Sequence, residues 1–512
     1  MSSVSANNRR ITKNMLLLYM RMFLTMAVTL YTSRIVLNVL GIEDFGIYNV
    51  VGGVVSTFGF MNAAMTTATQ RYLIFEFGRN NFNQLQKIFN TSLSIHALIS
   101  ILVIVLAETV GLWLLSNKLT IPSYRMDAAL WVFQLSVFSS VVMIMSVPYN
   151  AAIIAHEKMS AFAYISVLEV VLKLLIVFLL QVGDYDRLKM YAILIFAIQL
   201  CIRLIYGLYC DRYFPETKFR KMWDPKLFRE MLSFASWYLW ANCATIASTQ
   251  GVNILLNLFF NPVTNAARGI AVQVQGAFEQ FSISFQMALN PQITKSYAVH
   301  DYSYMHNLIF RSSKFSFFLL FLLLLPVMFE TEMILTVWLK IVPADTVIFV
   351  RLMLCATIVD TASNPLMVAA AATGKVRFYQ LAMGGTLLAI LPISYIVLKL
   401  GGNPSSVFVV HLCIFLLAFV VRLFIVCPMI ELSLTKYVKQ VVLRCLLVAV
   451  ISLILPLLLR FLFPEESIGH FLLVCLSCVV SVFVSVYYWG LDSSERLFVD
   501  RNVISLISKI GR

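Results

Sequence analysis

Charged side chains inside long apolar segments are the first feature of this sequence that could do chemistry. Arg21 lies well inside the segment 14–38, and Glu279 and Asp360 lie inside two later segments. A guanidinium at that depth costs at least about 2.5 kcal/mol on insertion scales unless it faces water, a ligand or a counter-ion. Arginine pairs with anions through two parallel hydrogen bonds. The acidic pair Glu279 and Asp360 would suit a coupling cation or a proton.

Uncharged polar residues follow one face of several of these segments at helical spacing. Thr25 shares a face with Arg21, and the densest stripe contains Gln275, Glu279 and Gln286. Such stripes more often pack helices together than bind a ligand, and both interpretations stay open here. Their recurrence in equivalent segments, with charges inside them, favours a common aqueous cavity. The candidate cavity residues are Arg21, Thr25, Gln70, Lys173, Asn242, Thr249, Asn253, Gln275, Glu279 and Gln286.

Other intramembrane charges have structural explanations. Lys173 could contact a ligand, or it could neutralise Glu169, which lies four residues earlier on the same helical face. Arg203 and Arg422 lie toward the inner ends of their segments, where their side chains can reach the lipid headgroups.

Composition places all of these residues in an integral membrane protein. Hydrophobic residues make up 60% of the 512 positions and charged residues 12%. Apolar runs that could each cross a bilayer, which takes about 20 residues, recur about fourteen times and should be helices. We place them at 14–38, 46–72, 88–115, 128–152, 160–181, 190–210, 230–258, 266–290, 308–328, 346–372, 377–398, 406–428, 438–462 and 468–489.

An internal repeat organises these segments. Shifting the chain by about 220 positions places Thr69-Gln70-Arg71 on Leu289-Asn290-Pro291, and Pro148 with Ala155 and Lys158 on Pro365 with Ala372 and Lys375. We therefore predict an all-α fold of two pseudo-symmetric six-helix lobes followed by two further helices. The predicted boundaries are 1–215 and 216–432 for the lobes, 433–490 for helices 13 and 14, and 491–512 for a cytoplasmic tail, which is either an interfacial helix or frayed.

Charge and cysteine usage set the orientation. Most of the 39 Lys and Arg residues fall in segments that place both termini in the cytoplasm, which also accounts for the net charge of +14 without nucleic-acid binding. The nine cysteines lie in or at the ends of predicted helices, so we expect no structural disulfide, and Cys475 with Cys478 is expected to serve packing. Because no catalytic or metal-binding motif occurs, we expect a non-enzyme without a metal.

Several stretches resemble a known family. Ser33-Arg34-Ile35-Val36-Leu37, Leu40-Gly41 through Phe45-Gly46-Ile47-Tyr48, and Ala68-Thr69-Gln70-Arg71-Tyr72 look like Wzx-type O-antigen flippases of the multidrug/oligosaccharidyl-lipid/polysaccharide (MOP) exporter superfamily. The second lobe departs from this motif, because Asn265-Ala266-Ala267-Arg268-Gly269 stands in place of Phe45-Gly46-Ile47-Tyr48. The resemblance implies a V-shaped, MATE-like fold around a central cavity. It also implies alternating access in the bacterial cytoplasmic membrane.

The implied substrate is an undecaprenyl-pyrophosphate-linked oligosaccharide, an O-antigen or capsule repeat unit. In this hypothesis Arg21, assisted by Lys173, grips the pyrophosphate, and Glu279 and Asp360 couple transport to H⁺ or Na⁺. We expect no other cofactor, a monomer, and contacts with membrane lipids and with the polysaccharide polymerase and chain-length machinery. The alternatives are a MATE-like cation-coupled exporter of small molecules, a lipid II flippase and, from another class, a membrane enzyme.

Overall fold

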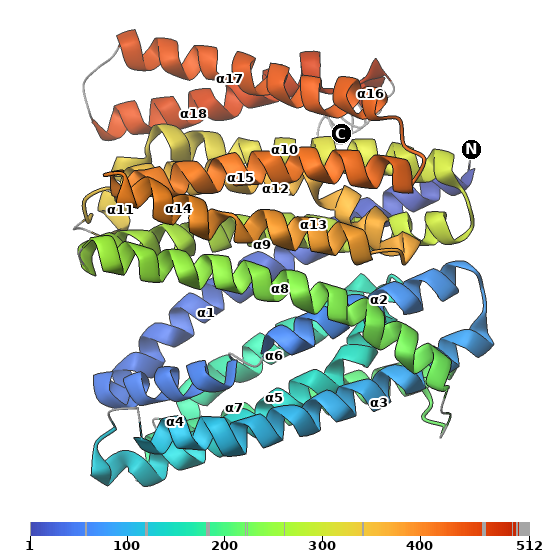
Figure 1. The fold of residues 1–512 in the computed structure, drawn as a ribbon, viewed down its shortest axis with the longest axis vertical. Helices are drawn as coiled ribbons and strands as arrows, with labels where there is room; N and C mark the ends of the chain where they lie inside the picture. The colour runs from blue at the N-terminus through green and yellow to red at the C-terminus, as the bar shows by residue number, and fades with distance from the viewer. Residues whose placement is uncertain are drawn as a thin grey trace, which may run out of the picture. The chain divides into compact units, whose positions relative to one another are not determined.

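Helices make up all of the regular structure in the part of the chain that is described (Figure 1). The computed structural model describes residues 2–500 apart from 57–58, 118–120, 181–184, 221, 223, 261, 340–341, 463–466, 494 and 498–499. Side chains at 2–13, 30, 33, 34, 37, 42, 49, 54, 56, 60, 61 and 262 also lie outside the description. The all-α membrane class is confirmed, and residues 501–512 of the predicted tail lie outside the described residues.

The helices follow the predicted segments in order. The first part of the chain forms α1 (Ser2–Ser56), α2 (Gly59–Gly78), α3 (Phe82–Leu106), α4 (Leu112–Asn117), α5 (Met126–Ala155), α6 (Met159–Leu179) and α7 (Arg187–Tyr213). The rest forms α8 (Pro225–Phe259), α9 (Pro262–Ala298), α10 (Tyr302–Phe329), α11 (Thr331–Leu339), α12 (Thr346–Thr373), α13 (Arg377–Leu388), α14 (Ile390–Lys399), α15 (Pro404–Met429), α16 (Leu434–Tyr437), α17 (Leu443–Leu462) and α18 (Ile468–Ser485).

Two long helices, α8 and α9, are more polar than the stretches that qualify as membrane spans. Among the described residues, 10 helical stretches are long and apolar enough to cross a membrane. The helices α8 and α9, with 35 and 37 residues, are long enough but too polar to belong to that set. They contain two of the polar stripes found in the sequence. The same side chains that indicate a cavity therefore lower the mean hydropathy of these helices.

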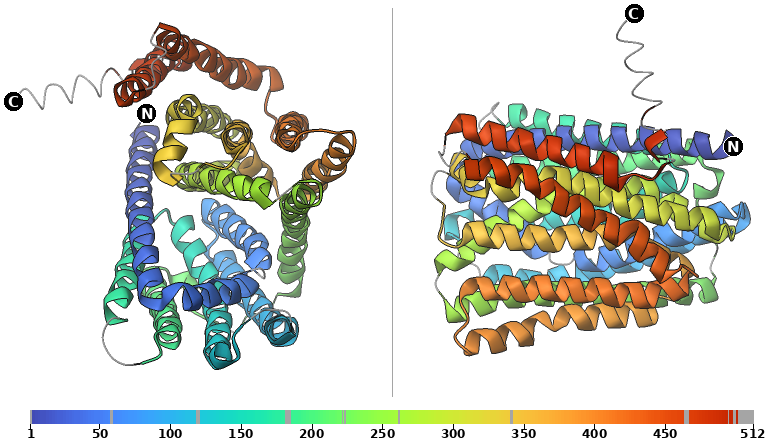
Figure 2. Two further views of the ribbon diagram at one scale, coloured as in Figure 1. Left: turned by 90° about the vertical axis from the view of Figure 1, so that its left-hand side faces the viewer. Right: turned by 90° about the horizontal axis from the view of Figure 1, so that it is seen from above.

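A kink at Gly41 of α1 marks the break expected between the first two segments. Gly41 has φ 80° and ψ 168°, and the helix continues on both sides of it (Figure 2). This left-handed φ is open to glycine at no steric cost, because glycine has no Cβ. Two helices therefore meet at Gly41, at the break expected between the predicted segments 14–38 and 46–72.

Two compact units emerge from the contacts between Cα atoms. Unit 1 contains residues 1–243, 287–301 and 374–381, and unit 2 contains residues 244–286, 302–373 and 382–512. The lobe boundaries predicted from the repeat stay a prediction.

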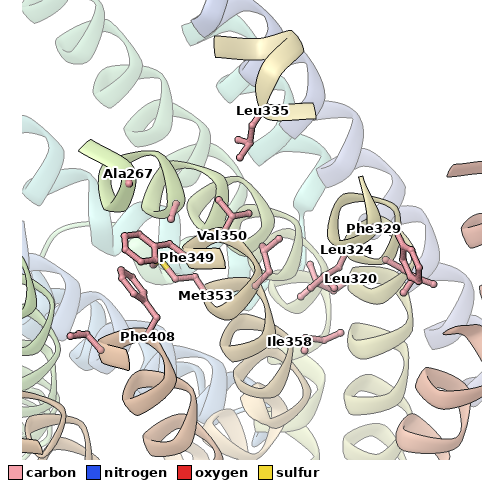
Figure 3. Packing of buried hydrophobic residues seen from close by; sticks show 14 of the residues in the cluster. Ala267, Leu320, Leu324, Phe329, Leu335, Phe349, Val350, Met353, Ile358 and Phe408 are labelled. Atoms are coloured by element: carbon pink, nitrogen blue, oxygen red, sulfur yellow. The ribbon is translucent and has the colours of Figure 1, made fainter. Parts of the chain in front are cut away.

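The core of unit 2 packs around aromatic and branched side chains of α9, α10, α12 and α15 (Figure 3). The rings of Phe349 and Phe408 stack with centroids 4.1 Å apart, and Met353 lies beside them (Figure 3). Ala267 of α9 is fully buried in the same cluster. In lipid, helices gain little from hydrophobic burial, so this close packing is what holds them together.

The two last helices, α17 and α18, pack against each other and against α10 of the same unit. A buried ion pair ties the following residues to this group, because Lys314 Nζ of α10 lies 2.8 Å from Glu495 Oε2. Their side chains are 3% and 5% exposed. Such a pair is well placed to fix the helices to unit 2, since leaving either charge alone in this environment would be costly.

Candidate functional site

Arg21 of unit 1 lies against α6. Its Nη1 is 3.5 Å from Ser166 Oγ, and its guanidinium carbon is 4.8 Å from the centroid of the Phe162 ring. The buried Nε of Arg21 has no hydrogen-bond partner among the residues that the structure describes. The guanidinium therefore keeps donor capacity that an anionic ligand could use.

Lys173 forms an ion pair with Glu169, as the spacing of the two residues on one helix had suggested. Its Nζ lies 2.6 Å from Glu169 Oε1, and Gln199 Nε2 lies 3.4 Å from the same oxygen. Two further predicted residues of unit 1, Gln70 on α2 and Asn242 on α8, are half-buried, as is Thr25.

Unit 2 contains a cavity of about 300 Å³ inside the helix bundle. That volume is at the lower end of the range for ligand pockets, which is about 300–1,000 Å³. Three predicted residues, Thr249, Gln275 and Glu279, line it. The whole lining is Thr245, Ser248, Thr249, Val252, Arg268, Val272, Gln275, Gly276, Glu279, Met353, Leu387, Ile390, Val407, Phe408, His411 and Phe415.

The polar groups of this cavity are held by neighbouring backbone and amide groups. Arg268 Nη2 donates to the carbonyl oxygen of Thr249 at 2.7 Å, and Nη1 lies 3.4 Å from Oδ1 of Asn253, another predicted residue. Gln275 Nε2 donates to Glu279 Oε1 at 2.8 Å. The cavity thus presents one cation, one carboxylate and an amide on apolar walls, which is the pattern of sites that orient a polar ligand.

His411 of α15 also lines the cavity. Its ring lies 4.4 Å from the Phe415 ring, and its buried Nδ1 makes no hydrogen bond within the described part of the chain. A ring nitrogen in this state can accept or donate a hydrogen bond, depending on the tautomer.

Sequence reasoning missed Arg268 and His411 as site residues. Arg268, Val272, Gln275 and Glu279 follow one another at helical spacing on α9, so extending the polar stripe two turns toward the start of the helix would have found Arg268. His411 is an isolated ionisable residue in an apolar segment, which is itself a signal of function in membrane proteins.

Two predicted residues of unit 2 have partners of their own. Gln286 is buried and donates to Ser282 Oγ at 2.9 Å, which makes it part of the packing of α9. Asp360 Oδ1 lies 3.1 Å from Nη1 of Arg422, whose side chain is only 7% exposed. The expectation that Arg422 extends to the headgroups is therefore wrong, because the nearby carboxylate offers a counter-ion inside the bundle.

The fold is that of MATE-family transporters. The chain matches an outward-facing multidrug resistance MATE family transporter of the MOP superfamily with TM-score 0.69 at 11% identity, covering 83% of this chain and 97% of that one. It also matches a MOP superfamily transporter from Pyrococcus furiosus described as having a binding pocket of reverse polarity, with TM-score 0.67 at 11% identity, covering 83% and 97%.

A third similar structure is the Vibrio cholerae MATE transporter VcmN in its bent form, with TM-score 0.67 at 14% identity, covering 85% of this chain and 100% of that one. No protein-family model and no curated protein matches the sequence. At these identities the similarity defines the fold, and the substrate has to be argued from the site.

Proposed function

We propose that this chain is a flippase that moves an undecaprenyl-pyrophosphate-linked oligosaccharide, an O-antigen or capsule repeat unit, across the bacterial cytoplasmic membrane by alternating access. Both termini lie in the cytoplasm in this proposal. The fold of MOP superfamily transporters supports a membrane transporter. The Wzx-like stretches around Gly41 and Gln70 support a lipid-linked sugar as cargo.

The observation that carries this proposal is the mixed polarity of the cavity in unit 2. Arg268 and Glu279 balance each other in charge, and Gln275, Thr249 and His411 add donors and acceptors. Sugar hydroxyls both donate and accept hydrogen bonds, so such a cavity suits a sugar. An exporter of organic cations would prefer acidic and aromatic side chains without a guanidinium.

Arg21 supplies the grip on the pyrophosphate. Its Nε keeps a donor free of partners among the described residues, and a phosphate would add charge-assisted hydrogen bonds to it. Lys173 is bound to Glu169, so it assists only if the phosphate takes the place of that carboxylate. Arg21 is therefore the principal anion-binding residue of the proposal.

Of the two carboxylates proposed to couple transport to H⁺ or Na⁺, Glu279 is the stronger candidate and Asp360 the weaker one. Glu279 opens onto the cavity and is held by one amide hydrogen bond, whereas Asp360 already has Arg422 as its counter-ion. A carboxylate that forms no ion pair within the described part of the chain responds more readily to an added cation or proton than one that already has a counter-ion.

Reconstitution tests the proposal. Purified protein in liposomes that contain a fluorescent undecaprenyl-pyrophosphate oligosaccharide should move the lipid to the opposite leaflet. Arg268→Gln and Glu279→Gln should each slow this movement at least about tenfold, a ratio that corresponds to about 1.4 kcal/mol. Gln280→Ala, one residue from Glu279 and outside the cavity lining, is the matched control.

Each alternative has its own outcome. Drug resistance on expression without any effect on glycan export would replace the proposal by a small-molecule exporter, and a requirement for growth with transport of lipid II would indicate a lipid II flippase. Turnover of a sugar substrate by the purified protein would indicate a membrane enzyme. We also propose that the chain is a monomer and that it contacts the polysaccharide polymerase and the chain-length machinery. The purified monomer should then move lipid-linked sugar in liposomes that contain neither of these partners.

A further inference from the structure

Segments of the two sequence repeats meet inside unit 1. This unit contains residues 287–301 and 374–381, which belong to the second repeat, together with the first repeat. These segments are the end of α9 and the turn between α12 and α13. They lie against the end of α2 and the turn between α5 and α6, and the distribution of Lys and Arg predicts that all four face the cytoplasm. We call these four segments the inner ends.

Glu157 is the centre of the first contact between inner ends. It lies in the turn between α5 and α6 with φ 55°, and it is 5% exposed. Its carboxylate accepts hydrogen bonds from Lys295 Nζ at 2.5 Å and from Gln292 Nε2 at 2.7 Å, both at the end of α9. The Lys295 ammonium also lies 4.3 Å from the centroid of the Phe77 ring of α2. The ammonium group of Lys295 on α9 therefore contacts two side chains of the first repeat, Glu157 and Phe77.

The second contact mirrors the first. In the sequence repeat, Gly374 of the turn between α12 and α13 is equivalent to Glu157. Gly374 has φ 76°, and a Cβ built there would lie 2.8 Å from Nη2 of Arg71 on α2. Each repeat therefore presents this turn to the helix end of the other repeat. Only the first turn carries a carboxylate, so the two contacts differ in charge although they correspond in position.

The helix ends themselves touch along their backbones. A Cβ on Gly78 of α2 would lie 3.0 Å from Cα and 3.2 Å from the carbonyl oxygen of Lys295. Arg79 Nε lies 3.4 Å from the carbonyl oxygen of Ala298. The ends of α2 and α9 therefore touch at this point, which leaves no room for a substrate between them.

We propose that Glu157, with Lys295 and Gln292, forms a latch that holds the inner ends closed and must open each time substrate enters from that side. The inference rests on the proposed function only in assigning the opening to substrate entry. Breaking the latch separates a nearly buried carboxylate from its cation, which gives the closed state a defined stability. Because both partners come from turns or helix ends of different repeats, a rearrangement of one repeat against the other would separate them.

Distance measurements on the purified full-length protein test the latch without any substrate. Spin labels on unnatural amino acids at Phe82 and Val299, both exposed near the inner ends, avoid the native cysteines. The wild type should show mainly one short distance. Glu157→Gln should raise the ratio of a longer to the short distance at least about tenfold, because Lys295 loses this carboxylate. Lys158→Gln, the exposed neighbouring residue, should leave the distribution as in the wild type.

Two further variants protect the test against misfolding. The exchange Glu157→Lys with Lys295→Glu should restore the short distance if the ion pair is the latch. If Glu157→Gln cannot be purified, Gln292→Leu removes one of the two donors and should shift the distribution in the same direction by a smaller amount. An unchanged distribution in both single variants would overturn the latch.

The failure of the proposed function gives a different result. Longer distances in Glu157→Gln, together with no movement of lipid-linked oligosaccharide by the wild type, would keep the latch and reject that cargo. Normal transport in a variant whose distances equal those of the wild type would reject the latch and keep the cargo.

Discussion

Nη1 of Arg422 on α15 lies 3.1 Å from Oδ1 of Asp360 on α12, although 62 residues separate them in the sequence. Arg422 also donates to Ser363 Oγ on the same helix as Asp360. The pair joins α12 to α15 inside unit 2, so part of the role of Asp360 is structural.

Substituting Asp360 separates its structural role from ion coupling. Asp360→Asn should lower the stability of the protein by about 1–3 kcal/mol, because the nearly buried Arg422 loses its counter-ion. Replacing both residues by leucine should recover most of this loss. The measurement is thermal unfolding in detergent together with transport. If the double variant is stable and still shows ion-dependent transport, Asp360 has no part in coupling.

Arg21 should be essential for transport but not for insertion. Arg21→Ala removes the guanidinium that contacts Ser166 and Phe162, and we expect export to be lost while the protein remains in the membrane. Arg21→Lys keeps the charge without the planar fork and should restore only part of the activity. Glycan export in a deletion strain, with membrane levels of each variant, measures this. Full activity of Arg21→Ala would remove Arg21 from the mechanism.

Acid should weaken the contact between Glu216 and His156 in unit 1. His156 Nε2 lies 2.5 Å from Glu216 Oε1, and the His156 ring stacks on Phe214 at 3.9 Å. Burial, the largest single effect, raises the pKa of Glu216, but the hydrogen bond with His156, a backbone hydrogen bond and the electrostatic interaction with His156 together outweigh it, so the pKa lies below the ordinary value of 4.5. The unfolded chain therefore takes up this proton more readily than the folded protein.

The stabilisation by Glu216 is fully present above about pH 4.5 and declines as the pH falls through the lowered pKa. Glu216→Gln should cost about 1.5–3 kcal/mol near neutral pH and should reduce the loss of thermal stability below pH 4.5. The control is Lys218→Gln, at an exposed position two residues away. Equal acid sensitivity of Glu216→Gln and the wild type would contradict this prediction.

Alanine substitutions at Gly374 and Gly401 distinguish the cost of backbone strain from the cost of a steric contact with Arg71 at the inner ends. Gly374 and Gly401 have φ 76° and φ 90°, so alanine is strained at both, by about 1–2 kcal/mol. A Cβ at Gly374 would also meet Arg71, whereas a Cβ at Gly401 would have nothing within 4 Å. We expect Gly374→Ala to lower the unfolding temperature more than Gly401→Ala. Equal shifts would mean that Arg71 moves aside without cost.

The sequence alone determined the membrane class, the order of the helices and which helices carry polar faces. A segment that crosses lipid must be helical and mostly apolar, so its position and its polar stripe are visible in the residues themselves. The polar stripes identified three residues that line the cavity, Thr249, Gln275 and Glu279. Gln275 and Glu279 both lie on α9, which brings them onto one wall of the cavity. The pair of Lys173 with Glu169 was visible for the same reason, because its spacing is local to one helix.

Only the tertiary structure decided which distant charges meet. Arg422 with Asp360, Lys295 with Glu157, and Arg268 with the carbonyl of Thr249 each join different elements of the chain. Their pairing depends on how each helix is rotated about its axis and which neighbour it packs against. Hydropathy specifies that a helix spans the bilayer but leaves its rotation and neighbours to the packing of side chains.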